Sequence, residues 1–162
     1  MLFHRSTEVA IQALIFLAQQ APGKLSPTHE IAAQAGVSEA YLAKILQRLT
    51  SAGLVRAFRG SGKGVELGRP AEELRLSSII NTVQGGLESD KCVLGLAICS
   101  EGNPCPLHDE WLPQRAAINQ MVEDKSLADL VRIYHQRPAI SPPVAPSEST
   151  PVNLEPQGGE SR

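Results

Sequence analysis

Apolar residues recur at spacings of three and four positions in the first third of the chain. This periodicity predicts helices over residues 6–20, 28–35 and 38–52. Ser6 or Thr7 is a candidate cap for the first helix, and Ser38 is a candidate cap for the third. Gly36 lies in the short link between the second and third helices, where a tight turn can use a positive φ. Two helices joined by such a link are typical of a helix-turn-helix.

A glycine-rich segment follows the third predicted helix. Two short apolar runs, residues 54–58 and 65–67, flank the sequence Arg59-Gly60-Ser61-Gly62-Lys63-Gly64. Three glycines in six residues suit the tip of a β-hairpin. The order of elements predicts a mainly α fold, a winged helix-turn-helix with a two-stranded wing. Later periodicity predicts helices over residues 76–83, 107–122 and 126–131.

Composition divides the chain into four parts. Residues 1–86 hold the winged helix-turn-helix domain, and residues 87–105 form a cysteine-bearing loop without helical or strand periodicity. Residues 106–134 hold a long amphipathic helix that we expect to mediate dimerisation. Residues 137–162 are rich in Pro, Ser, Gly and Glu, and we expect a disordered tail because their apolar content is too low to offset ordering entropy.

Charge is distributed unevenly along the chain. The net charge is −2, which by itself does not indicate nucleic-acid binding. Between residues 44 and 65, however, there is no acidic residue and there are five basic ones, Lys44, Arg48, Arg56, Arg59 and Lys63. A local basic face on an otherwise acidic protein favours contact with phosphates, although a solvated face or a protein-docking module would have the same charge.

The third helix is the expected reader of DNA, because the second helix of a helix-turn-helix enters the major groove with its N-terminal residues toward the bases. The residues expected to contact DNA are Ser38, Glu39, Ala40, Tyr41, Lys44 and Arg48 of this helix and Arg59 and Lys63 of the hairpin tip. No apolar run reaches the roughly 18 residues that span a membrane. We therefore expect a cytoplasmic protein with double-stranded DNA, and no membrane, as its partner.

Three cysteines and a histidine form a second candidate site. Cys92, Cys99, Cys105 and His108 have six, five and two residues between them. Three thiolates and an imidazole can hold a cluster iron or zinc. The wide spacing favours a cluster, since zinc usually takes tighter pairs with about two to four intervening residues. Inert buried thiols, a thiol-redox sensor and a structural zinc site remain alternatives.

An enzyme is the remaining class to consider. Cys105, His108 and Asp109 offer a nucleophile, a base and an orienting group. Catalytic partners normally converge from separate parts of a fold, and the chain has no phosphate-cradling loop or other substrate motif. We therefore expect no enzymatic activity.

The segment from Ile31 to Pro70 resembles the Rrf-type winged helix-turn-helix transcriptional regulators, the family of the iron–sulfur regulator IscR and the nitric-oxide sensor NsrR. The resemblance extends from about residue 6 to residue 131 and omits the tail. Lys63 replaces a glycine, and Val65 an aromatic residue, of the family's usual wing sequence. The motifs that carry the resemblance are Gly36-Val37-Ser38, Tyr41-Leu42, Ala52-Gly53-Leu54-Val55, Arg59-Gly60 and Arg69-Pro70.

The resemblance implies a homodimeric transcription factor, often a repressor, whose operator affinity is set by an iron–sulfur cluster that senses iron, redox state or nitric oxide. It implies that the three cysteines ligate the cluster. Cys105-Pro106-Leu107-His108 matches the IscR arrangement, which implies a 2Fe–2S cluster with His108 as fourth ligand. Glu8 is the alternative fourth ligand, donated by the partner subunit as in NsrR-like sensors, and would accompany a 4Fe–4S cluster. We favour 2Fe–2S, although the first two cysteines are one residue farther apart than in IscR.

Overall fold

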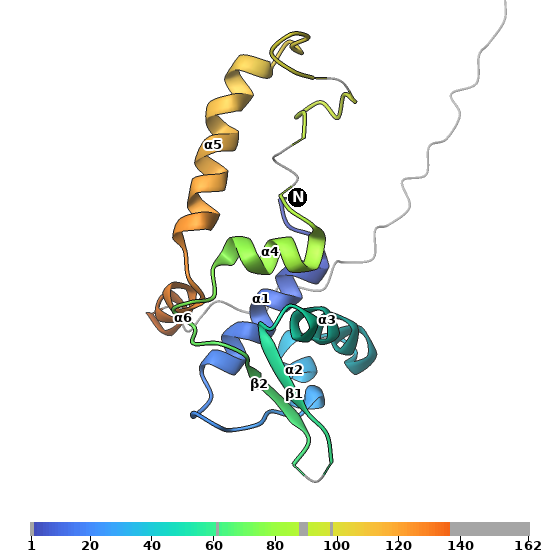
Figure 1. Cartoon of the computed structure of the whole chain (residues 1–162), viewed down its shortest axis with the longest axis vertical. Helices are drawn as coiled ribbons and strands as arrows, with labels where there is room; N and C mark the ends of the chain where they lie inside the picture. Colours follow the sequence, from blue (N-terminus) through green and yellow to red (C-terminus); the bar gives the residue numbers. More distant parts are fainter. Residues whose placement is uncertain (1, 61, 88–90, 98, 137–162) are drawn as a thin grey trace, which may run out of the picture.

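The computed structural model describes residues 2–60, 62–87, 91–97 and 99–136 (Figure 1). The predicted disordered tail, residues 137–162, lies outside the described residues. A two-stranded antiparallel sheet is formed by β1 (Val55–Phe58) and β2 (Gly64–Leu67). The helices are α1 (Arg5–Ala18), α2 (Thr28–Ala35), α3 (Glu39–Ser51), α4 (Leu76–Gln84), α5 (His108–Asp124) and α6 (Leu127–Gln136). The predicted mainly α winged helix-turn-helix is confirmed.

The apolar faces of the helices meet in one core around α1. Leu14 of α1, Ile31 of α2 and Leu42 of α3 are almost completely buried there. Leu127 of α6 enters the same core and is also fully buried. Residues 106–134 therefore divide between a long helix and a second helix that completes the core of the winged domain.

The turn between α2 and α3 has the predicted chemistry. Gly36 ends α2 with φ +63°, in the left-handed region that favours glycine. Ser38 caps α3, because its Oγ accepts a 3.3 Å hydrogen bond from the backbone amide of Tyr41. The cap and the turn together fix the direction in which α3 leaves the core.

The start of α1 differs from the sequence prediction. The helix begins at Arg5, and neither Ser6 nor Thr7 is its cap. Thr7 is fully buried instead, and its hydroxyl donates a 2.7 Å hydrogen bond to Gln84 of α4. The expected cap was wrong because a residue 77 positions away competes for that hydroxyl.

The wing is held at its base by backbone contacts. Arg56 lies opposite Glu66 across the two strands. Ser26 exchanges two 2.9 Å backbone hydrogen bonds with Val65, which ties the wing to the segment before α2. A Cβ atom at Gly68 would lie 2.3 Å from the carbonyl oxygen of Gly53, so only glycine fits at the base of β2.

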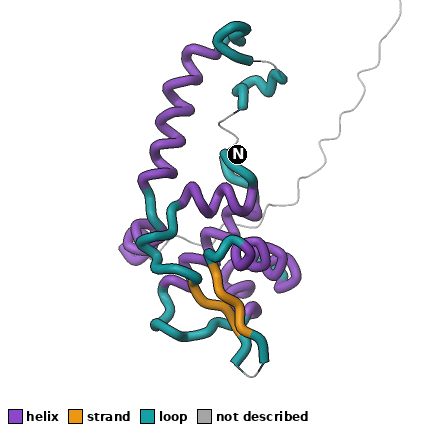
Figure 2. Tube along the Cα trace, in the orientation of Figure 1, coloured by secondary structure: helices purple, strands orange, loops and turns teal. Residues whose placement is uncertain are grey.

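Helix α5 extends away from the helical body, with the cysteine loop at its far end and the wing at the opposite end of the molecule (Figure 1). Val122 is its one buried residue and packs against Leu76 and Ile80 of α4. The helix continues through Pro113. The segment that leads from α4 to α5 is irregular throughout its described residues, as predicted (Figure 2).

The chain then reverses into α6. Ser126 caps this helix, since its Oγ accepts a 3.2 Å hydrogen bond from the amide of Asp129. Helix α6 is longer than predicted and ends at Gln136. Among the residues that the structure describes, no helix combines the length and the hydrophobicity needed to cross a membrane.

Candidate DNA-binding surface and metal centre

The burial of one face of α3 exposes the opposite face. Leu42, Ile45, Leu46 and Leu49 are buried in the core. The residues expected to read DNA, Ser38, Glu39, Ala40, Tyr41 and Lys44, are all exposed. The apolar stripe thus presents the N-terminal half of α3 to a partner, which is the geometry that the major groove requires.

The wing and the start of α3 border a common groove. Glu39, Phe58, Arg59 and Lys63 line it together with the N-cap and the first two residues of α2. Arg59 and Lys63 lie at the exposed hairpin tip, as the sequence predicted. Phe58 is 43 % exposed at the end of β1 and was missed by the sequence analysis, although an aromatic residue next to the Arg-Gly of a wing could have been noticed.

The five basic residues of this region have different partners. Arg48 donates a 2.9 Å hydrogen bond from Nη1 to the carbonyl oxygen of Val83 in α4. Arg56 pairs with Glu66 at 2.8 Å. The side chains of Lys44, Arg59 and Lys63 make no hydrogen bond or ion pair with any residue that the structure describes. These three cations are therefore available to an external anion.

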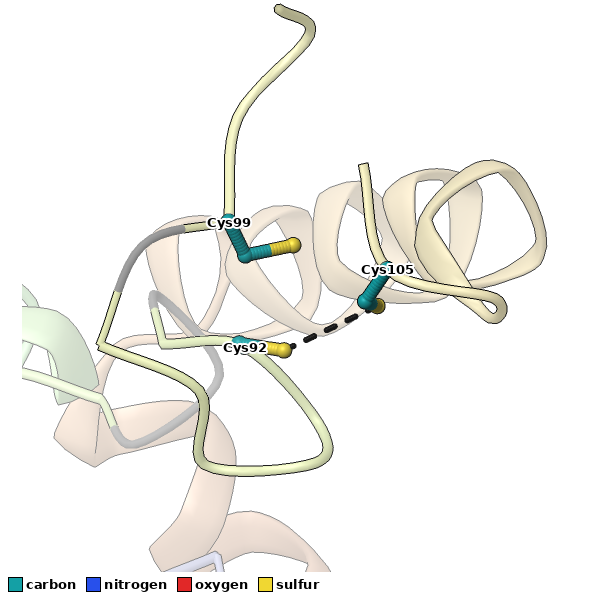
Figure 3. A group of neighbouring side chains, drawn as sticks. All are labelled: Cys92, Cys99 and Cys105. Atoms are coloured by element: carbon teal, nitrogen blue, oxygen red, sulfur yellow. Dashed lines mark hydrogen bonds between the residues drawn. The ribbon is translucent and has the colours of Figure 1, made fainter. Parts of the chain in front are cut away.

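The three cysteines converge although they are spread over 14 positions. Their Sγ atoms all lie within 4.8 Å of one another, and the side chains point toward a common centre (Figure 3). The Sγ atoms of Cys92 and Cys105 are 3.7 Å apart. Cys105 is 9 % exposed, and Cys92 and Cys99 are partly buried. This is a donor set for a thiophilic metal centre.

His108 joins this group through one sulfur. It is the first residue of α5, and its Nδ1 lies 3.2 Å from the Sγ of Cys99. Its Nε2 is buried and has no hydrogen-bond partner among the described residues. The group of ligand atoms within 4.8 Å of one another holds the three sulfurs but not His108, so the histidine reaches this centre through its Nδ1 contact with Cys99. Because buried polar atoms are nearly always satisfied, the orphaned Nε2 marks His108 as a residue whose surroundings the described residues do not complete.

The two closest thiols are in different electrostatic environments. A hydrogen bond from the backbone amide of Leu96 is the largest influence on Cys92 and lowers the pKa of its thiol. Burial is the largest influence on Cys105 and raises the pKa of its thiol. Cys92 is therefore more easily converted to the thiolate, which is the form that binds metals.

One side chain of α5 holds the cysteine loop in place. The indole Nε1 of Trp111 donates a 3.1 Å hydrogen bond to the carbonyl oxygen of Lys91, directly before Cys92. Within the loop, the amide of Gly95 donates to the carbonyl of Cys92 at 2.9 Å. The sequence analysis missed Trp111, and no local signal could have identified it, because the contact spans 20 positions.

Glu8 lies apart from the thiols. It is in the first turn of α1 and pairs with Arg5 at 3.3 Å. Within the described part of the chain, no carboxylate belongs to the group of ligand atoms around the three sulfurs. A role for Glu8 in this centre would therefore require a second copy of the chain.

Comparison with known proteins finds transcriptional regulators that are similar in sequence or in fold. The transcriptional regulator IscR of Vibrio atlanticus is 29 % identical over 123 residues, which cover 76 % of this chain and 70 % of that protein. CymR, described as the global cysteine regulator of B. subtilis, matches with a TM-score of 0.69 and 22 % identity over 82 % of this chain and 98 % of its own. IscR of T. potens matches with a TM-score of 0.66 and 23 % identity over 84 % of this chain and 90 % of its own. The two structures show the shared fold.

The family follows from a match over most of the chain. The model of the Rrf2 family, described as an iron-dependent transcriptional regulator, matches residues 3–133. The relatives are transcriptional regulators rather than enzymes, as the sequence predicted. The chain belongs to the Rrf2 family of transcriptional regulators.

Proposed function

We propose that this transcriptional regulator is a homodimeric repressor whose operator affinity is set by an iron–sulfur cluster held by Cys92, Cys99, Cys105 and His108. The observation that carries the proposal is the convergence of three Sγ atoms within 4.8 Å in a chain that also exposes a recognition helix and a basic wing. The first feature supports a sensor and the second supports binding to double-stranded DNA.

The ligand set supports a 2Fe–2S cluster over a 4Fe–4S cluster. Three thiols and a histidine match the IscR arrangement, and the Nδ1 of His108 lies 3.2 Å from Cys99 within this chain. Glu8 from the partner subunit is the alternative fourth ligand and would accompany a 4Fe–4S cluster. When bound, an iron–sulfur cluster supplies a labile, redox-active centre that iron shortage, oxidants or nitric oxide can remove.

On DNA, the N-terminal half of α3 is proposed to read base edges through Ser38, Glu39, Ala40 and Tyr41. Lys44, Arg59 and Lys63 supply unpaired charge for phosphates. Arg48 uses one of its N–H donors on the Val83 carbonyl, and its other donors remain for a phosphate.

Helix α5 supports a homodimer. It projects from the body, and Val122 is its one buried residue. Two copies joined along α5 would place two α3 helices for half-sites about one turn of DNA apart, roughly 34 Å. Because the cysteine loop lies at the far end of α5, its ordering would change the fit of the second copy and hence that separation.

Anaerobic purification followed by visible spectroscopy and iron and sulfide analysis tests the cluster. We expect a coloured protein, loss or change of the spectrum in His108→Ala, and an unchanged spectrum in Glu8→Ala. The opposite result for the two variants would identify Glu8 as the ligand. A colourless protein that contains zinc would replace the cluster with a structural zinc site.

A random double-stranded DNA library then identifies the bound sequence, and its affinity is compared between cluster-loaded and cluster-free protein. We expect the two forms to differ in affinity. Equal affinity would refute the sensing role and leave a DNA-binding regulator with a cluster of another purpose.

A cluster-free thiol sensor is a second candidate, favoured by the 3.7 Å separation of the Cys92 and Cys105 sulfurs. Hydrogen peroxide would oxidise the Cys92 thiolate to a sulfenic acid and release hydroxide; attack by the Cys105 thiol would then form a disulfide and release water. This function predicts a colourless protein whose DNA affinity changes with peroxide and returns with dithiothreitol. A Cys105→Ser variant that still responds would exclude it.

A further inference from the structure

We infer that Gln84 is a positioning residue that couples the base of the cysteine loop to the N-terminus of α1. The regulatory meaning of this coupling rests on the proposed function. The coupling itself belongs to the folded chain and can be measured without DNA or metal.

The Gln84 side chain joins three separate segments. Its Oε1 accepts hydrogen bonds from the hydroxyl of Thr7 at 2.7 Å and from the backbone amide of His4 at 3.0 Å. Its Nε2 donates to the carbonyl oxygen of Gly86 at 2.8 Å. One amide group therefore holds the start of α1 with one atom and the base of the cysteine loop with the other.

The orientation of this amide is fixed by its neighbours. The backbone amide of His4 can only donate, and the carbonyl of Gly86 can only accept. Rotation of the Gln84 amide by 180° would place donor against donor and acceptor against acceptor. It would also leave the Thr7 hydroxyl, which is fully buried, without its acceptor.

The segment held by Gln84 is a backbone turn. Gly85 and Gly86 have φ values of +81° and +127°, both in the region that favours glycine. The chain leaves α4 here and continues to the cysteine loop. Because glycine backbone is intrinsically permissive, the direction of exit depends on contacts made around the turn. These are the hydrogen bond from Gln84 to Gly86, the hydrogen bond from the amide of Gly85 to the carbonyl of Asn81, and the packing of Leu87 against α4.

The recognition helix reaches the same place. The carbonyl of Val83, which precedes Gln84, accepts the 2.9 Å hydrogen bond from Arg48 in the last turns of α3. A cation at a helix C-terminus satisfies a carbonyl that has no partner within the helix. A displacement of the end of α4 by the loop must therefore alter contacts with both α1 and α3.

Two substitutions separate the two ends of the amide. Thr7→Val removes the hydroxyl that holds the Oε1 end and keeps the side-chain shape. Gln84→Glu keeps the acceptors but has no donor for Gly86. Two matched controls make the same chemical changes in hydrogen bonds that span only four positions. In Thr82→Val the lost hydroxyl is one that donates to the carbonyl of Ser78 within α4. In Gln20→Glu the lost Nε2 donor is one that binds the carbonyl of Phe16 just beyond the end of α1, while the Oε1 that accepts from Lys24 is kept.

Hydrogen exchange of the metal-free full-length protein, followed by mass spectrometry, measures the coupling. We expect Thr7→Val to speed exchange in residues 86–87 and 91–97, and Gln84→Glu to speed exchange in residues 5–9, each by about 3- to 10-fold. The controls should leave both segments unchanged. The coupling is refuted if Thr7→Val speeds exchange only in residues 5–9 and Gln84→Glu speeds it only in the segment that begins at residue 86.

Thr7→Ser is a control that separates loss of the hydrogen bond from a general loss of packing around residue 7. It keeps the hydroxyl and should leave exchange in residues 86–87 and 91–97 at the wild-type rate. If Thr7→Ser loosens the loop as much as Thr7→Val, the hydrogen bond is not the cause and the inference is overturned.

Operator affinity then distinguishes the inference from the proposed function. We expect the ratio of cluster-loaded to cluster-free affinity to shrink about 3- to 10-fold in both variants, with iron content unchanged. A wild-type ratio of one would refute the proposed sensing but leave the exchange result standing. A wild-type ratio that differs from one and persists in both variants would overturn the role of Gln84.

Discussion

The salt dependence of DNA binding should depend on the three cations that the fold leaves unpaired. Lys44, Arg59 and Lys63 have no intramolecular partner among the described residues, whereas Arg56 pairs with Glu66 at 2.8 Å across the wing. Release of counterions from DNA requires charge that reaches a phosphate. Lys63→Gln should therefore weaken the salt dependence, and Arg56→Gln should not.

The size of the effect follows from this count. Each neutralised phosphate contributes about −0.9 to the slope of log affinity against log salt. Counting only the three cations without an intramolecular partner, and leaving out Arg48 because Val83 holds part of its guanidinium, gives about −2.7 per copy and about −5.4 for two copies. Lys63→Gln removes one cation per copy, so the slope should fall to about −3.6. Between 50 and 200 mM salt, the wild type would lose affinity about 2000-fold and the variant about 150-fold.

Fluorescence anisotropy of a labelled operator across this salt range measures both slopes, with cluster content matched between proteins. Arg56→Gln is the control, because it removes the same charge from the same strand pair. An unchanged slope for Lys63→Gln, or an equal reduction for Arg56→Gln, would show that pairing within the chain does not decide which cations meet phosphates.

Three further predictions concern the loop and the core. Trp111→Phe loses the bond to the Lys91 carbonyl and should lose iron to a chelator faster than wild type, as followed by visible absorbance; an equal rate would contradict the anchoring role. Hydrogen bonds from the amide and hydroxyl of Ser126, with the nearby Arg132, lower the pKa of Asp129 to about 2. Its contribution to stability should therefore be present above about pH 4 and disappear as the pH falls toward about 2, and Asp129→Asn should remove this part of the pH dependence of Tm. Leu127→Ala should lower the free energy of unfolding in urea by about 2–5 kcal/mol, because this side chain is fully buried; a loss below about 1 kcal/mol would place α6 outside the core.

The winged fold could be predicted because its signals are local. The stripe of Leu42, Ile45, Leu46 and Leu49 determines which face of α3 is buried. The opposite face, with the residues proposed to read DNA, can therefore be identified as exposed from the sequence alone. The turn at Gly36 and the cap at Ser38 each depend on residues within three positions. Segments whose conformation is decided by such near neighbours are those that a single sequence specifies most directly.

The cap of α1 and the intramolecular partner of Arg48 could not be predicted, because both depend on contacts between residues far apart in the sequence. Thr7 is chemically a good cap, but its hydroxyl binds Gln84 of α4. Arg48 has the charge and spacing of a phosphate contact, but one of its donors binds the carbonyl of Val83, which is also in α4. Both contacts depend on how α4 packs against α1 and α3, and residue type alone does not specify that packing.

Helix α5 shows a third case, in which most of a correctly predicted apolar stripe is left uncovered by the described residues. The sequence predicts an amphipathic helix over residues 107–122, and the structure forms it with Val122 alone buried. Met121 remains 47 % exposed, as do apolar residues of the neighbouring loop such as Leu94 and Leu96 at 50 %. Most of the stability of a helix in a protein comes from the packing of its apolar face, which here is largely exposed. The proposed second copy would cover this face and bring the two cysteine loops into the same interface. A change in one loop would then alter the positions of both recognition helices.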